Sequence, residues 1–169
     1  YWFVTHDGTA PVDLRVDVFV DGRADLIFNF GAPYRRHVLG GATEEHARSN
    51  LDAQRLVPIR IEQRGLVRIA GVRFVLGGLG PFATGPLRPF TGLTPEPSAV
   101  LGPDAMVLEE ALRQTESIDA QTERLDAFFS ERLDLDASYL GFERILSQLT
   151  ASEGGATVND LASSAHLSS

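Results

Sequence analysis

The sequence contains no cysteine and no lysine, and it has no long uninterrupted hydrophobic run. The lack of cysteine excludes a disulfide framework, a thiolate metal site and a cysteine nucleophile. No stretch approaches the roughly 20 consecutive apolar residues that a membrane-spanning helix requires. The first residues also lack the charged region and the cleavage site of a signal peptide. We therefore expect a cytoplasmic protein without a membrane partner.

Arginine supplies all 15 of the strongly basic residues, and these are spread unevenly against the acidic ones. Residues 1–100 contain 11 arginines and 10 acidic residues, whereas residues 101–169 contain 4 arginines and 13 acidic residues. The net charge of the chain is −8. Nucleic-acid binding favours the opposite balance, because basic side chains must replace the counterions of the phosphates. These residues alone therefore predict no specific binding to DNA.

The first hundred residues have the pattern of antiparallel β-strands. Apolar and polar residues alternate over 12–20, which is the period of two of a half-buried strand. Asp21-Gly22 follows at once, and this pair predicts a tight hairpin to a second, central strand over 25–30. Further strands are predicted over 34–39, 56–62 and 66–76, with a polar loop over 40–52. Many short antiparallel strands with glycine turns favour a barrel or a jelly roll.

Beyond the strands, the sequence changes character twice. Residues 77–103 contain six prolines, which predicts irregular structure lying over the barrel. After residue 102 the apolar spacing has the 3.6-residue period of helices. We predict three helices capped by Asp104, Ser117 and Asp136, and a last short helix that begins at Thr157 with Asp160 completing a capping box. The expected fold class is α+β, mainly β with C-terminal helices.

The last residues have the spacing of the first helix and turn of a helix-turn-helix. That motif needs a small residue where its two helices approach closely, and Ala162 supplies one. It also needs a turn residue that tolerates a positive φ angle, and His166 occupies this position. Ser168 or Ser169 would cap the following helix. The alternative is an ordinary amphipathic C-terminal helix.

Two blocks of sequence form a recognisable pattern. The first is Val18-Phe-Val-Asp-Gly-Arg-Ala-Asp-Leu-Ile-Phe-Asn-Phe-Gly31, and the second is Gly71-Val-Arg-Phe-Val-Leu-Gly-Gly-Leu-Gly-Pro-Phe82. They resemble the motifs Leu-Pro-Asp-Gly-Cys-x-Asp-Leu-Ile-Phe-Asn-Leu-Gly and Gly-Val-Arg-Phe-x-Pro-Gly-Gly of a sensor domain in AraC-type bacterial transcription regulators. The chain departs from these motifs at Val20, Arg23 and Leu76, where the family has proline, cysteine and proline. The turn-forming Asp21-Gly22 is kept.

This resemblance implies three parts in the family's order. Residues 1–102 would form a cupin-like sensor barrel, 103–135 a helical connector, and 136–169 the start of a helix-turn-helix DNA-binding domain. The recognition helix would begin near Ser168, so the side chains that read DNA bases would not be contained in this chain. The implied function is effector sensing and oligomerisation, with a small organic effector as a partner and promoter DNA as a partner of the full-length regulator only. The effector would act by population shift, changing how the connector presents the DNA-binding domain.

We expect the barrel to bind the effector without a metal or another cofactor. Its apolar walls would be Trp2, Phe28, Phe30 and Phe74, and its polar contacts Tyr34, His37 and Arg73. Arg73 shares a largely apolar strand face, where a guanidinium suits a ligand carboxylate or phosphate. Two alternatives stay open: Arg73 pairs with Asp25 instead, or the aromatic rings fill a closed core.

The sequence shows no catalytic motif, and we expect no enzymatic activity. It has neither a Gly-rich phosphate loop leading into a helix nor a Gly-x-Ser-x-Gly elbow. The cluster His37, Glu44, Glu45 and His46 straddles a Gly-Gly turn and lacks the spacing of a metal site. Two other functions remain as alternatives. One is a small cupin-fold enzyme of the isomerase or dioxygenase type, and the other is a protein-interaction module that binds no small ligand.

A homodimer is predicted through the helix around 118–133. Its apolar stripe includes Leu125 and the adjacent Phe128 and Phe129, and one helix cannot easily bury both rings against a single barrel face. The alternative is that both rings pack inside the chain, against the barrel and the next helix.

Overall fold

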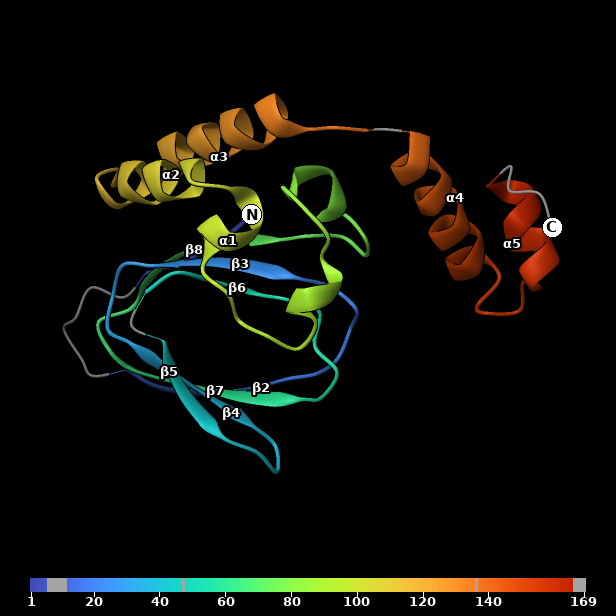
Figure 1. Cartoon of the computed structure of the whole chain (residues 1–169). Helices are drawn as coiled ribbons and strands as arrows, with labels where there is room; N and C mark the ends of the chain where they lie inside the picture. The colour runs from blue at the N-terminus through green and yellow to red at the C-terminus, as the bar shows by residue number, and fades with distance from the viewer. Residues whose placement is uncertain (6–11, 47, 136, 166–169) are drawn as a thin grey trace.

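The structure is a computed structural model that describes residues 1–5, 12–46, 48–135 and 137–165. Its strands form two antiparallel sheets that lie face to face, and the helices follow them along the chain (Figure 1). The first sheet has the order β1 (Trp2–Thr5), β8 (Arg68–Arg73), β3 (Asp25–Asn29), β6 (Asn50–Asp52). The second has the order β2 (Val12–Val18), β7 (Ile59–Gly65), β4 (Tyr34–Val38), β5 (Thr43–His46). The α+β class is confirmed.

The helical elements begin after the last strand. The helices are α1 (Pro97–Leu101), α2 (Asp104–Arg113), α3 (Ile118–Arg132), α4 (Ala137–Ala151) and α5 (Val158–Ser164), and the 3₁₀ turns are η1 (Gly80–Phe82) and η2 (Arg88–Phe90). Within the described ranges, no helix is long and apolar enough to cross a membrane.

The predicted hairpin at Asp21-Gly22 is wrong, because the chain crosses between the sheets at this point. Strand β2 pairs with β7 in the second sheet, whereas β3 pairs with β6 and β8 in the first. Gly22 does adopt a left-handed φ of 72°, as the turn pattern required. The turn residues were therefore identified correctly, but the partners of the two strands that flank the turn are set by contacts distant in sequence.

The predicted polar loop over 40–52 is also wrong. Gly40 and Gly41 form the tight turn of a hairpin that joins β4 to β5, with His37 opposite Thr43. The same stretch then supplies β6, in which Asp52 pairs with Asp25 of β3. Polar composition concealed these strands, because β5 lies at a sheet edge, where polar residues are common.

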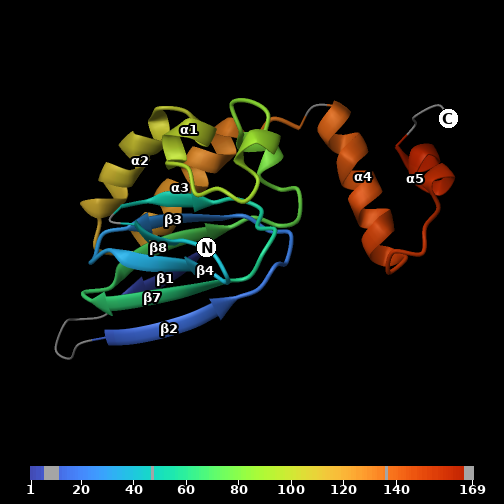
Figure 2. The same ribbon diagram turned by 60° about the horizontal axis from the view of Figure 1, so that its bottom comes forward.

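The two sheets do not close into the predicted barrel. The edge strands are β1 and β6 in one sheet and β2 and β5 in the other, and no ladder joins the sheets within the described residues. Strands that follow each other along the chain nevertheless lie in different sheets, except β4 and β5, and Figure 2 shows the strands lying below helices α1–α3.

The main hydrophobic core lies outside the sandwich, between the first sheet and helices α1–α3 (Figure 1). Leu26 and Phe28 of β3 face the helices, together with Val72 of β8 and Leu112 of α2. Because side chains alternate across a strand, Ile27 points to the opposite face, toward the second sheet. Strand β3 is buried along its whole length, which confirms the predicted central position.

The predicted caps Ser117 and Thr157 are confirmed, whereas the predicted cap Asp104 is wrong: α2 begins at Asp104 itself, Pro103 occupies the cap position, and no side chain caps the helix. The Ser117 hydroxyl accepts a hydrogen bond from the backbone N–H of Ala120 at the start of α3. Thr157 and Asp160 form a capping box at the start of α5. The predicted cap Asp136 and the predicted turn residues His166 and Ser168 lie outside the described residues.

Candidate functional site

A network of arginines and aspartates lies at one end of the sandwich, with Asp25, Asp52 and Arg55 buried and Arg73 and Asp21 exposed at its rim. The Arg73 guanidinium binds the Asp25 carboxylate through two hydrogen bonds, Nε to Oδ1 at 2.8 Å and Nη2 to Oδ2 at 2.9 Å. Arg55 donates a hydrogen bond to Asp52, and its Nη2 lies 3.9 Å from carboxylate oxygens of Asp21 and Asp25. The network therefore fastens the segment between β2 and β3 and the segment after β6 to the end of β8.

Burial changes the acid–base properties of this network. Burial raises the pKa of Asp52, although Arg55 and Arg36 oppose the rise by stabilising its ionised form. The hydrogen bonds to Asp25 raise the pKa of Arg73 above its ordinary value. The fork of Arg73 that was predicted to hold a ligand anion is thus filled by Asp25, as in the alternative considered from the sequence.

A cavity of about 280 Å³ opens beside this network, on the helix-facing side of the first sheet. We call it the sheet-end pocket; it is lined by Gly22, Ala24, Leu51, Ala53, Gln54, Phe74, Val75, Gly77, Leu79, Leu87, Arg88, Phe90 and Thr91. Its floor comes from the residues just before β3, from β6 and the residues after it, and from the residues just after β8, and its cover comes from the proline-rich segment that follows. Mainly apolar walls with a few polar groups are typical of a small-molecule site.

Backbone hydrogen bonds hold the cover of the pocket in place. The N–H of Leu51 donates to the carbonyl of Pro95, that of Ala53 to Leu93, and that of Gly92 to Gln54, at 2.9, 3.2 and 2.9 Å. Residues 92–95 therefore run beside β6 and fix the position of η2 over the cavity. The predicted irregular structure is confirmed over 77–96, apart from the short turns η1 and η2, whereas residues 97–101 form helix α1, which was not predicted, and the segment covers the first sheet rather than a barrel.

Gly77 connects the sheet-end pocket to helix α4. It lines the cavity, and its φ of 75° belongs to the left-handed region that favours glycine. A Cβ atom at this position would lie 2.7 Å from Leu146 Cδ1 and 2.7 Å from Phe142 Cε1. Both side chains belong to α4, so this helix packs directly against the backbone that closes the pocket.

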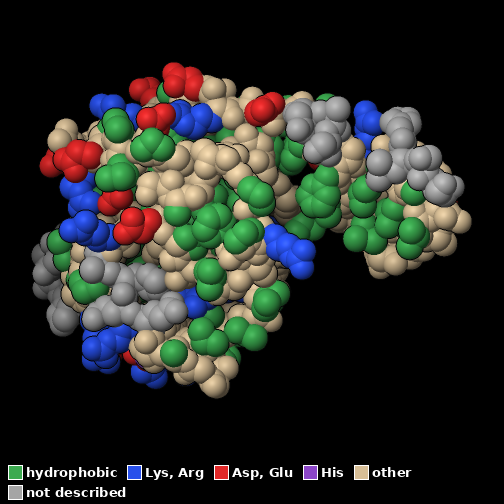
Figure 3. Space-filling model, in the orientation of Figure 1, with side chains coloured by type: hydrophobic (Ala, Val, Ile, Leu, Met, Phe, Trp, Pro, Cys, Tyr) green, Lys and Arg blue, Asp and Glu red, His purple; other side chains and the backbone are tan. Residues whose placement is uncertain are grey.

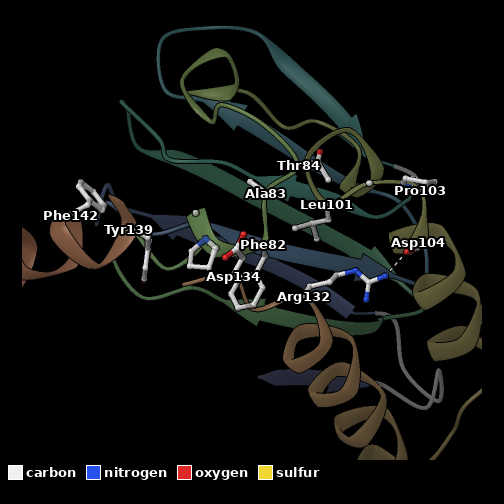
Figure 4. A pocket seen from close by; sticks show the side chains of 13 residues that line it. Phe82, Ala83, Thr84, Leu101, Pro103, Asp104, Arg132, Asp134, Tyr139 and Phe142 are labelled. Carbon is white, nitrogen blue, oxygen red and sulfur yellow. Dashed lines mark hydrogen bonds and ion pairs between the residues drawn. The ribbon is translucent and has the colours of Figure 1, made fainter. Parts of the chain in front are cut away.

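A second, more open cavity of about 630 Å³ lies where α4 meets the rest of the chain (Figure 4). On one side of this cavity, Arg132 at the end of α3 donates a hydrogen bond to Asp104 at 2.5 Å. Tyr139 and Phe142 of α4 line the other side of the cavity. The N–H of Asp134 donates to the carbonyl of Pro81 at 3.3 Å. Figure 3 shows the α4–α5 lobe meeting the main body across a narrow junction. The lobe therefore touches the body through few residues.

The structure does not bring the seven predicted ligand residues together. Phe28 and Phe74 belong to the core against the helices, and only Phe74 also lines the sheet-end pocket. Trp2 lies over Gly71, and Tyr34 is buried in the second sheet, where it accepts a hydrogen bond from Asn50 at 2.6 Å.

The remaining predicted contacts lie on other surfaces. The Phe30 ring is covered by the guanidinium groups of Arg68 and Arg113, at 5.4 and 5.1 Å. His37 bonds Thr43 at 2.9 Å and lies 3.4 Å from Glu62 on the second sheet. Of the residues that line the sheet-end pocket, only Phe74 was predicted, and those missed include Leu87, Arg88 and Phe90 of the proline-rich segment. The signal for Leu87 and Phe90 was an apolar residue directly after a proline.

The three residues predicted to form a dimer interface are buried inside the chain. Leu125 is fully buried, and Phe128 and Phe129 are 7% and 6% exposed. Phe129 packs edge-on against Phe74 at 5.6 Å and Phe82 at 5.0 Å, so the strand, the η1 turn and α3 share one aromatic cluster. One helix does bury both rings, and these side chains offer no surface to a partner.

The cluster of His37, Glu44, Glu45 and His46 lies only partly within the side chains that the structure describes. Among the residues that the structure describes, no three histidine, aspartate or glutamate side chains come together in a way that could hold a metal ion. The side chains of Glu44, Glu45 and His46 lie outside that description.

No family model, curated protein or solved structure matches this chain.

Proposed function

We propose that this chain is the effector-sensing region of an AraC-type transcription regulator. The two sequence blocks that resemble this family meet in space, because Asp25 of the first block binds Arg73 of the second. Both blocks also line the sheet-end pocket, through Gly22 and Ala24 on one side and Phe74 to Leu79 on the other. The strand orders 1-8-3-6 and 2-7-4-5 are those of a double-sheet jelly roll, the architecture of cupins.

One observation carries this proposal: Gly77 contacts both the pocket and helix α4. An effector in the pocket would touch the segment from Val75 to Leu79, and any displacement of Gly77 would change its contact with Phe142 and Leu146. A ligand shifts an equilibrium only if it binds the two states with different affinities. Here the two states are α4 docked on Gly77 and α4 released from it.

Helices α4 and α5 are the proposed start of the DNA-binding domain. They contact each other, and α5 has the capping box expected of a helix that begins at Thr157. Residues 101–169 include 13 acidic residues and 4 arginines, a balance that does not favour contact with phosphates. Promoter recognition is therefore assigned to a basic part of the regulator that follows these helices.

The proposal is tested by filling the pocket with a side chain. Ala53→Leu places a larger apolar group in the cavity and stands in for a bound effector. Because the chain has no cysteine, labels are introduced only where wanted, at Met106→Cys on α2 and Thr150→Cys on α4. We expect Ala53→Leu to change the distance distribution between the labels, measured by pulsed electron spin resonance.

A matched control adds the same group elsewhere. Ala127→Leu lies on the exposed face of α3 and should leave the distance distribution unchanged. An unchanged distribution in Ala53→Leu, with the variant folded and the pocket filled, would contradict coupling between the pocket and α4. It would then favour a protein-interaction module.

A further inference from the structure

We infer that the sheet-end pocket binds a small organic anion with an apolar body, and that Arg88 binds its acidic group. This inference rests on the proposed sensing function and adds the chemical class of the effector. It replaces Arg73, whose guanidinium already binds Asp25, with a different arginine at a different place in the fold.

The apolar body follows from the walls of the cavity. Leu51, Ala53 and Phe74 form the floor, and Leu79, Leu87 and Phe90 lie on the side of the cover. The volume of about 280 Å³ is just below the roughly 300–1,000 Å³ common for small-molecule sites. It suits a single ring or a short branched chain.

The anionic group of the ligand is inferred from the charge of Arg88, which is unpaired among the described residues. Within the described part of the chain, the exposed Arg88 side chain has no hydrogen bond and no ion pair. The pocket lining includes no acidic residue, so Arg88 gives the cavity a net positive charge. Other arginines near the first sheet differ, since Arg55 and Arg73 bind aspartates and Arg113 binds Glu109.

Arg88 is also held on a rigid support. It opens the η2 turn, where Pro89 fixes the backbone and the N–H of Thr91 donates to the Arg88 carbonyl at 3.2 Å. Gln54 and Thr91 line the same cavity and can donate further hydrogen bonds through an amide and a hydroxyl. A carboxylate at this rim would therefore meet one cation and two neutral donors.

The test compares acids with neutral molecules of the same shape. Isothermal titration calorimetry on the whole chain measures the binding of benzoate and phenylacetate against benzamide and phenylacetamide. We expect the acids to bind at least about tenfold more tightly than the amides, because a hydrogen bond to a charged group is about twice as strong as a neutral one. The preference should decrease as the salt concentration rises.

Two variants separate the charge from the cavity. Arg88→Ala should remove the preference for acids, and Arg88→Lys should restore part of it. The matched control Arg64→Ala removes an exposed arginine of the second sheet and should leave binding unchanged. Acids that bind no better than amides, or an unchanged preference in Arg88→Ala, would overturn the assignment of an anion.

The outcomes for the inference and for the proposed function remain distinct. If the amides bind and Ala53→Leu abolishes their binding, the pocket and its sensing role stand while the anion assignment fails. If none of the four probes binds at millimolar concentration, the anion assignment is overturned, and the label-distance experiment still decides whether the pocket is coupled to α4.

Discussion

Replacing Arg55 with methionine should strongly destabilise the protein. The Arg55 side chain is only 2% exposed; it donates a hydrogen bond to Asp52, and its Nη2 lies 3.9 Å from both Asp21 and Asp25. Methionine fills a similar space without a charge, so Asp52 keeps only Arg36, 3.7 Å away. Removing one partner of a buried ion pair costs about 3–5 kcal/mol, because the other charge stays buried. We expect the free energy of unfolding to fall by that amount.

The loss should depend on pH in a definite direction. Burial raises the pKa of Asp52 in the folded protein above its unfolded value, so the ionised form lowers stability at neutral pH. Protonation relieves this cost as the pH falls toward the unfolded pKa. Removing Arg55 raises the folded pKa further, since a stabilising positive charge is lost. The effect of Arg55→Met should therefore be largest near about pH 7 and smaller near about pH 5.

Urea unfolding, followed by circular dichroism and by the fluorescence of the single tryptophan, measures this effect. Arg64→Met is the control, because Arg64 makes one exposed ion pair with Asp13 at 3.3 Å and should contribute little. If Arg55→Met costs no more than Arg64→Met at neutral pH, the buried network does not hold the crossing segments together.

Three further expectations follow from the packing, the caps and the charge. Phe129→Ala should lower the free energy of unfolding by about 3–5 kcal/mol, because it opens a cavity in the aromatic cluster. The melting temperature of the wild type should not depend on protein concentration, because the cluster lies within one chain. Thr157→Ala should cost α5 about 0.5–2 kcal/mol, seen as faster amide exchange in its first turn. Hydrogen bonds from Thr157 lower the pKa of Asp160, so this cap should be intact above the unfolded pKa and lost as the pH falls through the lowered folded value. Residues 1–169 should not shift promoter DNA in a gel at low salt, and tight sequence-dependent binding would contradict the charge argument.

Local signals in the sequence predicted local structure well. Ser117 and Thr157 cap their helices because a cap needs only a side-chain oxygen within three residues of the orphan N–H groups. Strand pairing is different, because Asp21-Gly22 suits both a hairpin turn within one sheet and a turn that crosses from one sheet to the other. Whether the chain returns to the same sheet or crosses to the other depends on the pairing of β2 with β7 and of β3 with β8, and these partner strands are distant in sequence. The sequence pattern could not supply that choice.

The candidate site was harder to predict for a related reason. The period of two showed that Leu26 and Phe28 share a strand face, but it did not show which layer covers that face. Helices α2 and α3 cover it, so a predicted pocket wall became part of the core. The cover of the actual cavity comes from the segment around η2, whose proline-rich composition predicts irregular structure but not the position of Leu87 or Arg88.

The central claim is that the sheet-end pocket and helix α4 are coupled through Gly77, and a double-mutant experiment tests it most directly. The Met106→Cys and Thr150→Cys labels report the position of α4 in six chains: wild type, Gly77→Ala and Gly40→Ala, each with and without Ala53→Leu. Gly77→Ala displaces Phe142 and Leu146 directly, and Gly40→Ala is the control, since Gly40 has a similar φ of 82° with no atom within 4 Å of an added Cβ. The account predicts that Ala53→Leu shifts the label distance in the wild-type and Gly40→Ala backgrounds and causes no further shift in Gly77→Ala. Equal shifts in all three backgrounds would contradict it.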